Sequence, residues 1–175
     1  MRKVLYIFGF LTDGDIAWMA RTGTRRRLAD GEVVIREGTS AEALVLLLDG
    51  EFVVTAESHG EIARLGIGEI VGEMSLVDTG PASATITARG ESLALFLDFE
   101  ILRDKLDRDE GFGARFYRAL AVFLADRLRA TRVARAALRD AAALSQDELD
   151  LAIIDHIQAA GERFTRMLAV LSGPR

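Results

Sequence analysis

The residues best suited to chemistry lie together in residues 66–88, where glycines, carboxylates, hydroxyls and a proline crowd between apolar runs. Glycine lets the backbone adopt positive φ and approach a ligand closely. Free N–H groups at the start of a short helix attract anions. Residues 72–76 (Gly-Glu-Met-Ser-Leu) are the predicted helical turn, and residues 78–81 (Asp-Thr-Gly-Pro) close the loop before the next strand. The stretch therefore predicts a cradle for an anionic group.

This pattern resembles the phosphate-binding cassette of cyclic-nucleotide-binding domains, whose usual form is F-G-E-(L/M)-(A/S)-L, a short gap and (P)-R-(S/A)-A-(T)-(V/I). Residues 72–76, which include Ser75, match the first half, and residues 81–86 match the second. The resemblance implies that Glu73 accepts a hydrogen bond from the ribose 2′-hydroxyl. It assigns backbone or hydroxyl donors for the phosphate to Gly72, Met74, Ser83 and Ala84. The implied ligand is cAMP, cGMP or a cyclic dinucleotide, and no metal is expected.

One position departs from the family pattern. Ala82 stands where the family usually has the arginine that pairs with the cyclic phosphate. A charge-assisted contact of this kind is worth on the order of 1.5–3 kcal/mol, which is roughly one to two decades in affinity. Glu73 would also face the phosphate with no adjacent cation, unless Arg132 or Arg135 reaches across from the following helix. We therefore expect weakened or altered binding of cAMP or cGMP.

The elements that must position this cradle change from helical to extended spacing at Glu32. Before it, residues 12–15 offer capping oxygens to a short helix that ends near Gly23, and Arg25–Arg27 is interpreted as a solvated turn. After it, short apolar or alternating runs with glycine turns favour an antiparallel barrel or jelly roll. The predicted strands are 33–35, 43–48, 52–55, 61–65, 84–88 and 93–97. The predicted class is α+β, mainly β, and the family resemblance covers roughly residues 8–132.

A short helix at residues 102–106 and two further helices are predicted after the strands. The first of these two covers residues 114–140, after a break at 110–113. Its apolar stripe is Phe116, Leu120, Phe123, Leu124, Leu128, Thr131 and Leu138. In the catabolite activator class of the resembled family, this helix forms the dimer seam and closes over the nucleotide base. The resemblance places Thr131 near the polar residue that contacts the base there. A polar residue tolerated in a helix seam is the alternative interpretation.

The second helix opens with a capping box at residues 145–148. Its apolar residues are spaced three or four apart, so it must pack on the preceding helix, on a second subunit or on a partner. We divide the chain into residues 1–140, the cyclic-nucleotide-binding-like domain, and residues 141–175, an additional helix. About thirty-five residues follow Asp140, too few for the winged helix-turn-helix domain of the family's transcription factors. DNA binding is therefore not expected, whereas a homodimer or a protein partner is.

Composition excludes several further classes. The chain has 175 residues, 50% of them apolar, and a net charge of −5, which argues against general nucleic-acid binding. It has no cysteine and two histidines without motif-spaced partners, so we expect no enzyme. No run approaches the ~18 apolar residues of a membrane span, and a cytoplasmic location is expected. The predicted function is a regulatory module that senses a small molecule and signals through its C-terminal helices. The alternative is a scaffold that binds no ligand.

Overall fold

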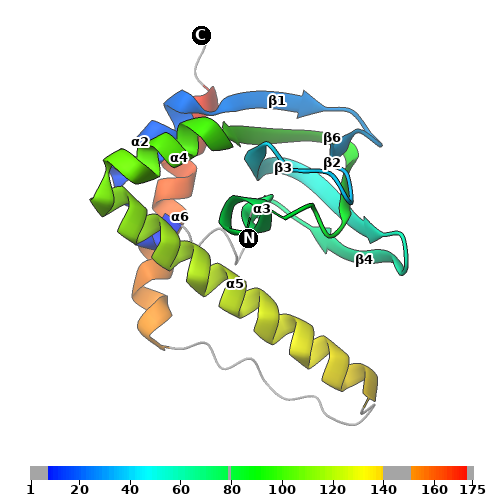
Figure 1. Cartoon of the computed structure of the whole chain (residues 1–175). Coiled ribbons are helices and arrows are strands. Elements are labelled where there is room, and N and C mark those ends of the chain that lie inside the picture. The colour runs from blue at the N-terminus through cyan, green and yellow to red at the C-terminus, as the bar shows by residue number, and fades with distance from the viewer. Residues whose placement is uncertain (1–7, 79, 140–150, 173–175) are drawn as a thin grey trace.

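The computed structural model describes residues 8–78, 80–139 and 151–172, and within these the side chains of residues 130–139, 151–160 and 172 are not described. Most of the helices lie on one side of the sheet, and the long helix α5 extends away from them (Figure 1). The elements in chain order are α2 (Asp13–Thr22), β1 (Thr24–Leu28), β2 (Val33–Ile35), β3 (Ala43–Ala56), β4 (Gly60–Leu65), β5 (Ile70–Val71), α3 (Glu73–Val77), β6 (Thr85–Asp98), α4 (Phe99–Arg108), α5 (Glu110–Arg139) and α6 (Leu151–Ser172). The predicted α+β class is confirmed.

One antiparallel sheet holds the strands in the order β1-β6-β3-β4, with β2 paired to β6 and β5 paired to β3. The strands β3 and β6 have 14 residues each, so each replaces two predicted short strands. Asp49-Gly50 was expected to end a strand. It instead marks a register irregularity within β3, where Gly50 adopts a φ of +93°. A bulge of this kind bends a strand without ending it, so one continuous pair of strands forms the centre of the sheet.

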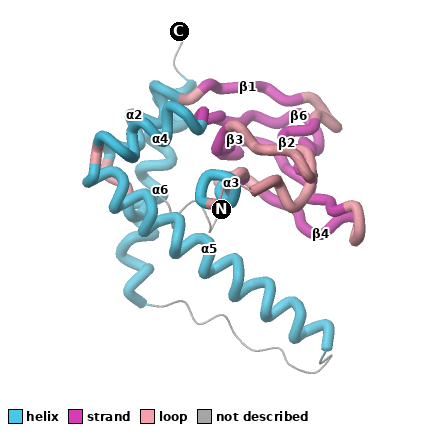
Figure 2. The backbone as a smooth tube through the Cα atoms, in the orientation of Figure 1, coloured by secondary structure: helices cyan, strands magenta, loops and turns pink. Residues whose placement is uncertain are grey.

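Two apolar clusters lie on the two faces of this sheet. Leu44, Leu46 and Leu48 of β3 join the cluster formed with the helices. Val45 and Leu47 join the other cluster, which the strands form among themselves. Because successive side chains of a strand point to opposite faces, residues 44–48 of β3 are buried on both faces of the sheet and form a continuous apolar run. In Figure 2 most of the helices lie to one side of the strands, and the short helix α3 lies beside the strands.

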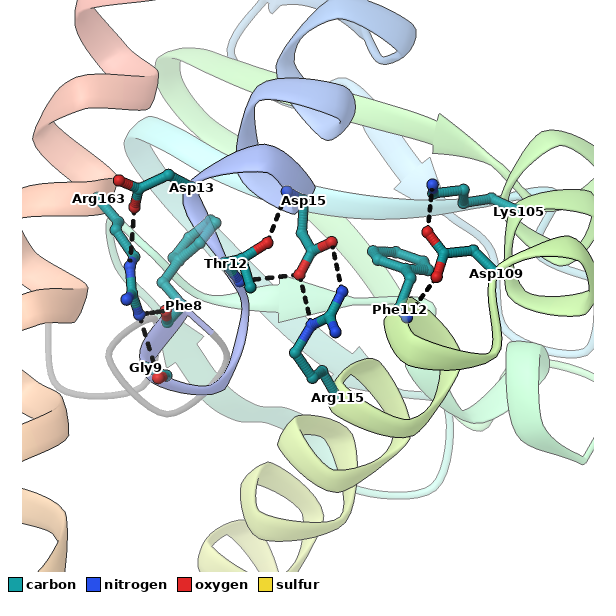
Figure 3. A network of polar contacts seen from close by, with 10 residues as sticks. All are labelled: Phe8, Gly9, Thr12, Asp13, Asp15, Lys105, Asp109, Phe112, Arg115 and Arg163. Atoms are coloured by element: carbon teal, nitrogen blue, oxygen red, sulfur yellow. Dashed lines mark hydrogen bonds and ion pairs between the residues drawn. The ribbon is translucent and has the colours of Figure 1, made fainter.

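The first turn of α2 is fixed by a capping box, as the residues Thr12–Asp15 predicted. The Thr12 N–H donates to the Asp15 carboxylate at 2.8 Å, and the Asp15 N–H donates to the Thr12 hydroxyl at 3.2 Å. Arg115 of α5 donates to both oxygens of Asp15, at 2.8 and 2.9 Å (Figure 3). Burial raises the pKa of Asp15, but the hydrogen bonds from Arg115 and Thr12 outweigh it and hold that pKa below its ordinary value.

Two local predictions were wrong in part. The three arginines Arg25–Arg27 are exposed, as expected, but they lie in strand β1, paired with β6, and not in a turn. The Arg26 guanidinium lies 4.6 Å from the centre of the Phe96 ring. Three charged residues in a row give no apolar alternation, so only the pairing reveals the strand. The break predicted at residues 110–113 instead lies just before them, at Asp109, and residues 110–113 are helical. The Asp109 side chain accepts a hydrogen bond from the Phe112 N–H at 2.9 Å, so α5 begins at Glu110.

The last helix, α6, packs against α2 of the same chain. Phe164, Met167 and Leu171 of its predicted apolar face are buried in the cluster that the helices share. The sequence left open packing on the preceding helix, on a second subunit or on a partner; the described residues of α6 instead pack on α2, which was not among these. The predicted capping box at residues 145–148 lies outside the described residues. The division of the chain at residue 140 stays a prediction.

Candidate ligand-binding site

A pocket lies between the turn of α3, the start of β6 and the middle of α5. Its lining includes seven of the eight residues predicted for the site: Gly72, Glu73, Met74, Ser75, Ala82, Ser83 and Ala84. The inner face of the sheet contributes apolar side chains, among them Val54 and Ile86. The two halves of the predicted cassette, separate in the sequence, therefore meet at one pocket. Their roles in binding stay predictions.

The backbone at the entrance to α3 requires glycine. Gly72 has a φ of +86° and is the N-terminal cap of α3. A Cβ atom at this position would lie 2.5 Å from the carbonyl oxygen of Ala43 in β3. Both the left-handed conformation and this close approach exclude a side chain. Gly72 therefore has a structural role whether or not a ligand binds.

Several polar groups of the cassette already have partners within the protein. The hydroxyl of Ser75 donates to the carbonyl of Gly80 at 3.2 Å. The N–H of Ala82 donates to the carbonyl of Thr39 at 2.8 Å, and the carbonyl of Ala82 accepts from the Gly38 N–H at 2.8 Å. These bonds tie the loop to its neighbours. Ser83 is exposed at the pocket, so its hydroxyl is accessible to a ligand.

The centre of the site is an ion pair between α3 and α5. The carboxylate of Glu73, whose side chain is 3% exposed, accepts a short hydrogen bond from Arg127, whose side chain is 34% exposed. Burial raises the pKa of Glu73, and the positive charge of Arg127 only partly offsets this effect. The expectation that Glu73 has no adjacent cation is therefore wrong. Arg127 is the only cationic side chain among the described residues that line the pocket.

The spacing of residues on α5 indicates that Arg127 faces the core. Arg127 lies four residues after Phe123, which with Phe116 and Leu120 forms the buried face of α5. Residues four apart lie on the same face of a helix, so an arginine at this position points toward the core. Arg132 and Arg135, considered as rescuing cations, lie on α5 beyond the last described side chain, as does Thr131.

The pocket is small. Its volume is about 60 Å³, compared with roughly 300–1,000 Å³ for pockets that bury a drug-sized ligand. Arg127 reaches into this space from α5 to meet Glu73. A nucleotide could enter only if this ion pair opened or if α5 moved. The site thus combines a hydroxyl, a buried carboxylate and one arginine in an otherwise apolar cavity.

Comparison with known proteins agrees with this geometry. Residues 25–109 match the model of the family described as the cyclic nucleotide-binding domain. These residues belong to the cyclic nucleotide-binding domain family. The matched range includes β1 to β6, α4 and the whole cassette. Arg127, on α5, lies after it.

Three similar proteins cover different shares of this chain. A protein of Rhodopseudomonas palustris, named for a potassium channel, is 34% identical over 105 residues, which are 59% of this chain and 26% of that protein. The N-terminal domain of a transcriptional regulator from Streptomyces coelicolor is 30% identical, with a TM-score of 0.59 over 73% of this chain and 94% of that one. The catabolite activator protein of Thermus thermophilus is 24% identical, with a TM-score of 0.63 over 97% and 91% of the two chains. The last likeness is one of fold.

The described residues show neither a membrane-spanning helix nor a metal site. None of their helices combines the length and the apolar character needed to cross a membrane. In the same part of the chain, no group of three or more histidines and carboxylates is arranged to hold a metal ion.

Proposed function

We propose that this domain is a regulatory module that senses a small anionic ligand, of the cyclic nucleotide class, in the pocket between α3 and α5. The observation that supports the proposal is the Glu73–Arg127 pair. It supplies the two groups that such a ligand requires: a carboxylate for a ribose hydroxyl and a cation for a phosphate. Arg127 takes over from α5 the charge that Ala82 lacks.

Binding on this proposal is an exchange of partners. The ligand's phosphate replaces Glu73 as the acceptor for Arg127, while a ligand hydroxyl donates to the released carboxylate. The exchange costs the existing ion pair, so we expect weaker binding than the family arginine would give. It also moves Arg127 relative to α3, so ligand binding changes the position of α5. A protein partner reading the position of the C-terminal helices is the expected output, and the net charge of −5 disfavours DNA as that partner.

Calorimetric titration with cAMP, cGMP and c-di-GMP tests the proposal. We expect one of them to bind the unmodified chain. Ala82→Arg should then bind roughly 10- to 100-fold more tightly, by the value of a charge-assisted contact. Arg127→Met should bind more weakly, whereas Arg129→Met, an exposed change two residues further along α5, should bind normally. If none of the three ligands binds the unmodified chain or Ala82→Arg, the proposal is wrong.

A scaffold that binds no nucleotide is the second candidate, favoured by the small volume of the pocket. Tyr117 and Leu128 of α5 are 50% and 57% exposed, and with Ala121 and Leu124 they follow the 4-3-4 spacing of a coiled-coil seam. We expect a homodimer through this face of α5 whether or not the domain binds a ligand. Light scattering over a concentration series measures it. A monomer at every concentration would contradict the dimer, and Leu128→Ser should weaken it.

A further inference from the structure

The first turn of α2 holds two different helices through two aspartates (Figure 3). Asp13 pairs with Arg163 and Arg166 of α6, at 3.1 and 2.6 Å. Asp15, two residues later, pairs with Arg115 of α5 at 2.8 Å. The same turn is fixed by the capping box with Thr12. The positions of α5 and α6 are therefore both tied to one turn of backbone.

Arg163 is the principal polar anchor of α6. Besides Asp13, it donates from Nη1 to the carbonyl of Phe8 at 3.0 Å and to that of Gly9 at 3.2 Å (Figure 3). The Phe8 ring lies beside Phe164 with 5.8 Å between centroids. One arginine thus joins α6 to both the N-terminal segment and α2. We call this group, Asp13 with Arg163 and Arg166, the Asp13 clamp.

A small surface pocket lies beside the Asp13 clamp. It has a volume of about 50 Å³, and its lining includes Ile16 and Ala20 of α2 and Met167 and Val170 of α6. Val170 is 58% exposed, and the Asp13 side chain is 56% exposed. Exposed ion pairs are weakened by salt, whereas the burial of Phe164, Met167 and Leu171 in the shared core is apolar. The Asp13 clamp is therefore the salt-sensitive part of the docking of α6.

We propose that α6 is a releasable helix, docked on residues 8–20 by its apolar face and by the Asp13 clamp, and that the Asp15–Arg115 pair couples this docking to the position of α5. The segment that covers this face of α2 is α6 itself, and the release of α6 is the regulatory signal. Moving α5 pulls on Asp15, which disturbs the capping box and shifts Asp13 away from its two arginines. This regulation rests on the proposed function only for its trigger, which is the movement of α5 when a ligand binds at Arg127. The clamp and its coupling to α5 are testable without a ligand.

Hydrogen exchange of the full chain measures the docking. Asp13→Lys replaces attraction to Arg163 and Arg166 with repulsion, and should speed exchange of the amides of residues 161–171 by roughly tenfold. Adding Arg166→Asp to Asp13→Lys restores one attractive pair and should recover part of the protection. Raising the salt concentration should speed exchange of the same amides in the unmodified chain. Glu162→Gln, an exposed change on α6, should have no effect.

The coupling is tested by Arg115→Met, which removes a side chain that has no contact with α6 among the interactions described above. Faster exchange in residues 161–171 is expected, with Arg129→Met as the matched control on α5. The amides of β3 report whether the fold itself is intact. Unchanged exchange of α6 in Asp13→Lys would overturn the clamp, and unchanged exchange of α6 in Arg115→Met would overturn the coupling. Because no ligand is added, failure here is separate from failure of nucleotide binding in the calorimetric titration.

Discussion

Replacing Arg127 with methionine should destabilise the protein in a way that depends on pH. The substitution keeps an aliphatic side chain on α5 but removes the cation beside Glu73, which is 2% exposed. A buried carboxylate without a partner is strongly unfavourable. Its burial already raises its pKa in the unmodified chain, and loss of Arg127 should raise that pKa further.

The magnitude has an upper limit, because Glu73 can escape the penalty by taking up a proton. At pH 7 the medium is 2.5 pH units above the ordinary glutamate pKa of 4.5. At 1.36 kcal/mol per unit, protonation costs about 3.4 kcal/mol there and about 1.4 kcal/mol at pH 5.5. The charge-dependent loss in Arg127→Met cannot exceed these values. A raised folded-state pKa means that stability is greatest at low pH and falls as the pH rises, so the loss should be larger at pH 7.

Urea denaturation at pH 5.5 and 7.0, followed by the fluorescence of Trp18, measures the effect. This tryptophan lies on α2, and the centre of its ring is 5.4 Å from that of Phe112 on α5. Its fluorescence therefore reports on the packing of these two helices. Arg127→Lys keeps the charge and should lose less stability. Adding Glu73→Gln to Arg127→Met removes the buried charge and should abolish the pH dependence. An equal loss at both pH values in Arg127→Met would refute the reasoning, because the effect would then come from packing.

Two further predictions concern local structure. Gly72→Ala should cost about 2 kcal/mol or more in urea denaturation, because it adds a contact with Ala43 to an unfavourable backbone conformation; Gly60→Ala, at a similar φ of +69° with nothing within 4 Å, should cost only about 1 kcal/mol. The lowered pKa of Asp15 contributes stability above its ordinary value of 3.8 that is lost as the pH falls through the folded-state pKa. Asp15→Asn should therefore flatten the acid limb of a stability–pH curve measured in urea, and equal acid sensitivity in both proteins would contradict this assignment.

The sequence by itself determined the features that depend on neighbouring residues. The capping box at Thr12–Asp15, the turn at Gly72 and the apolar runs of β3 were all predicted, because a cap, a positive φ and a strand pattern are each encoded within a few residues. The family motif likewise lies within residues 66–88. These local features were enough to predict the α+β class and the two halves of the site.

Only the tertiary structure decided which distant groups meet. Glu73 and Arg127 are 54 residues apart, and no local pattern pairs a carboxylate on a short turn with one of many arginines on a long helix. The docking of α6 on α2 follows from the same cause, since an amphipathic helix presents its apolar face to whichever surface the chain path allows. The strand at Arg25–Arg27 exists because β6 offers it backbone partners. In each case the deciding energy is a contact between segments far apart in the chain, which sequence spacing does not encode.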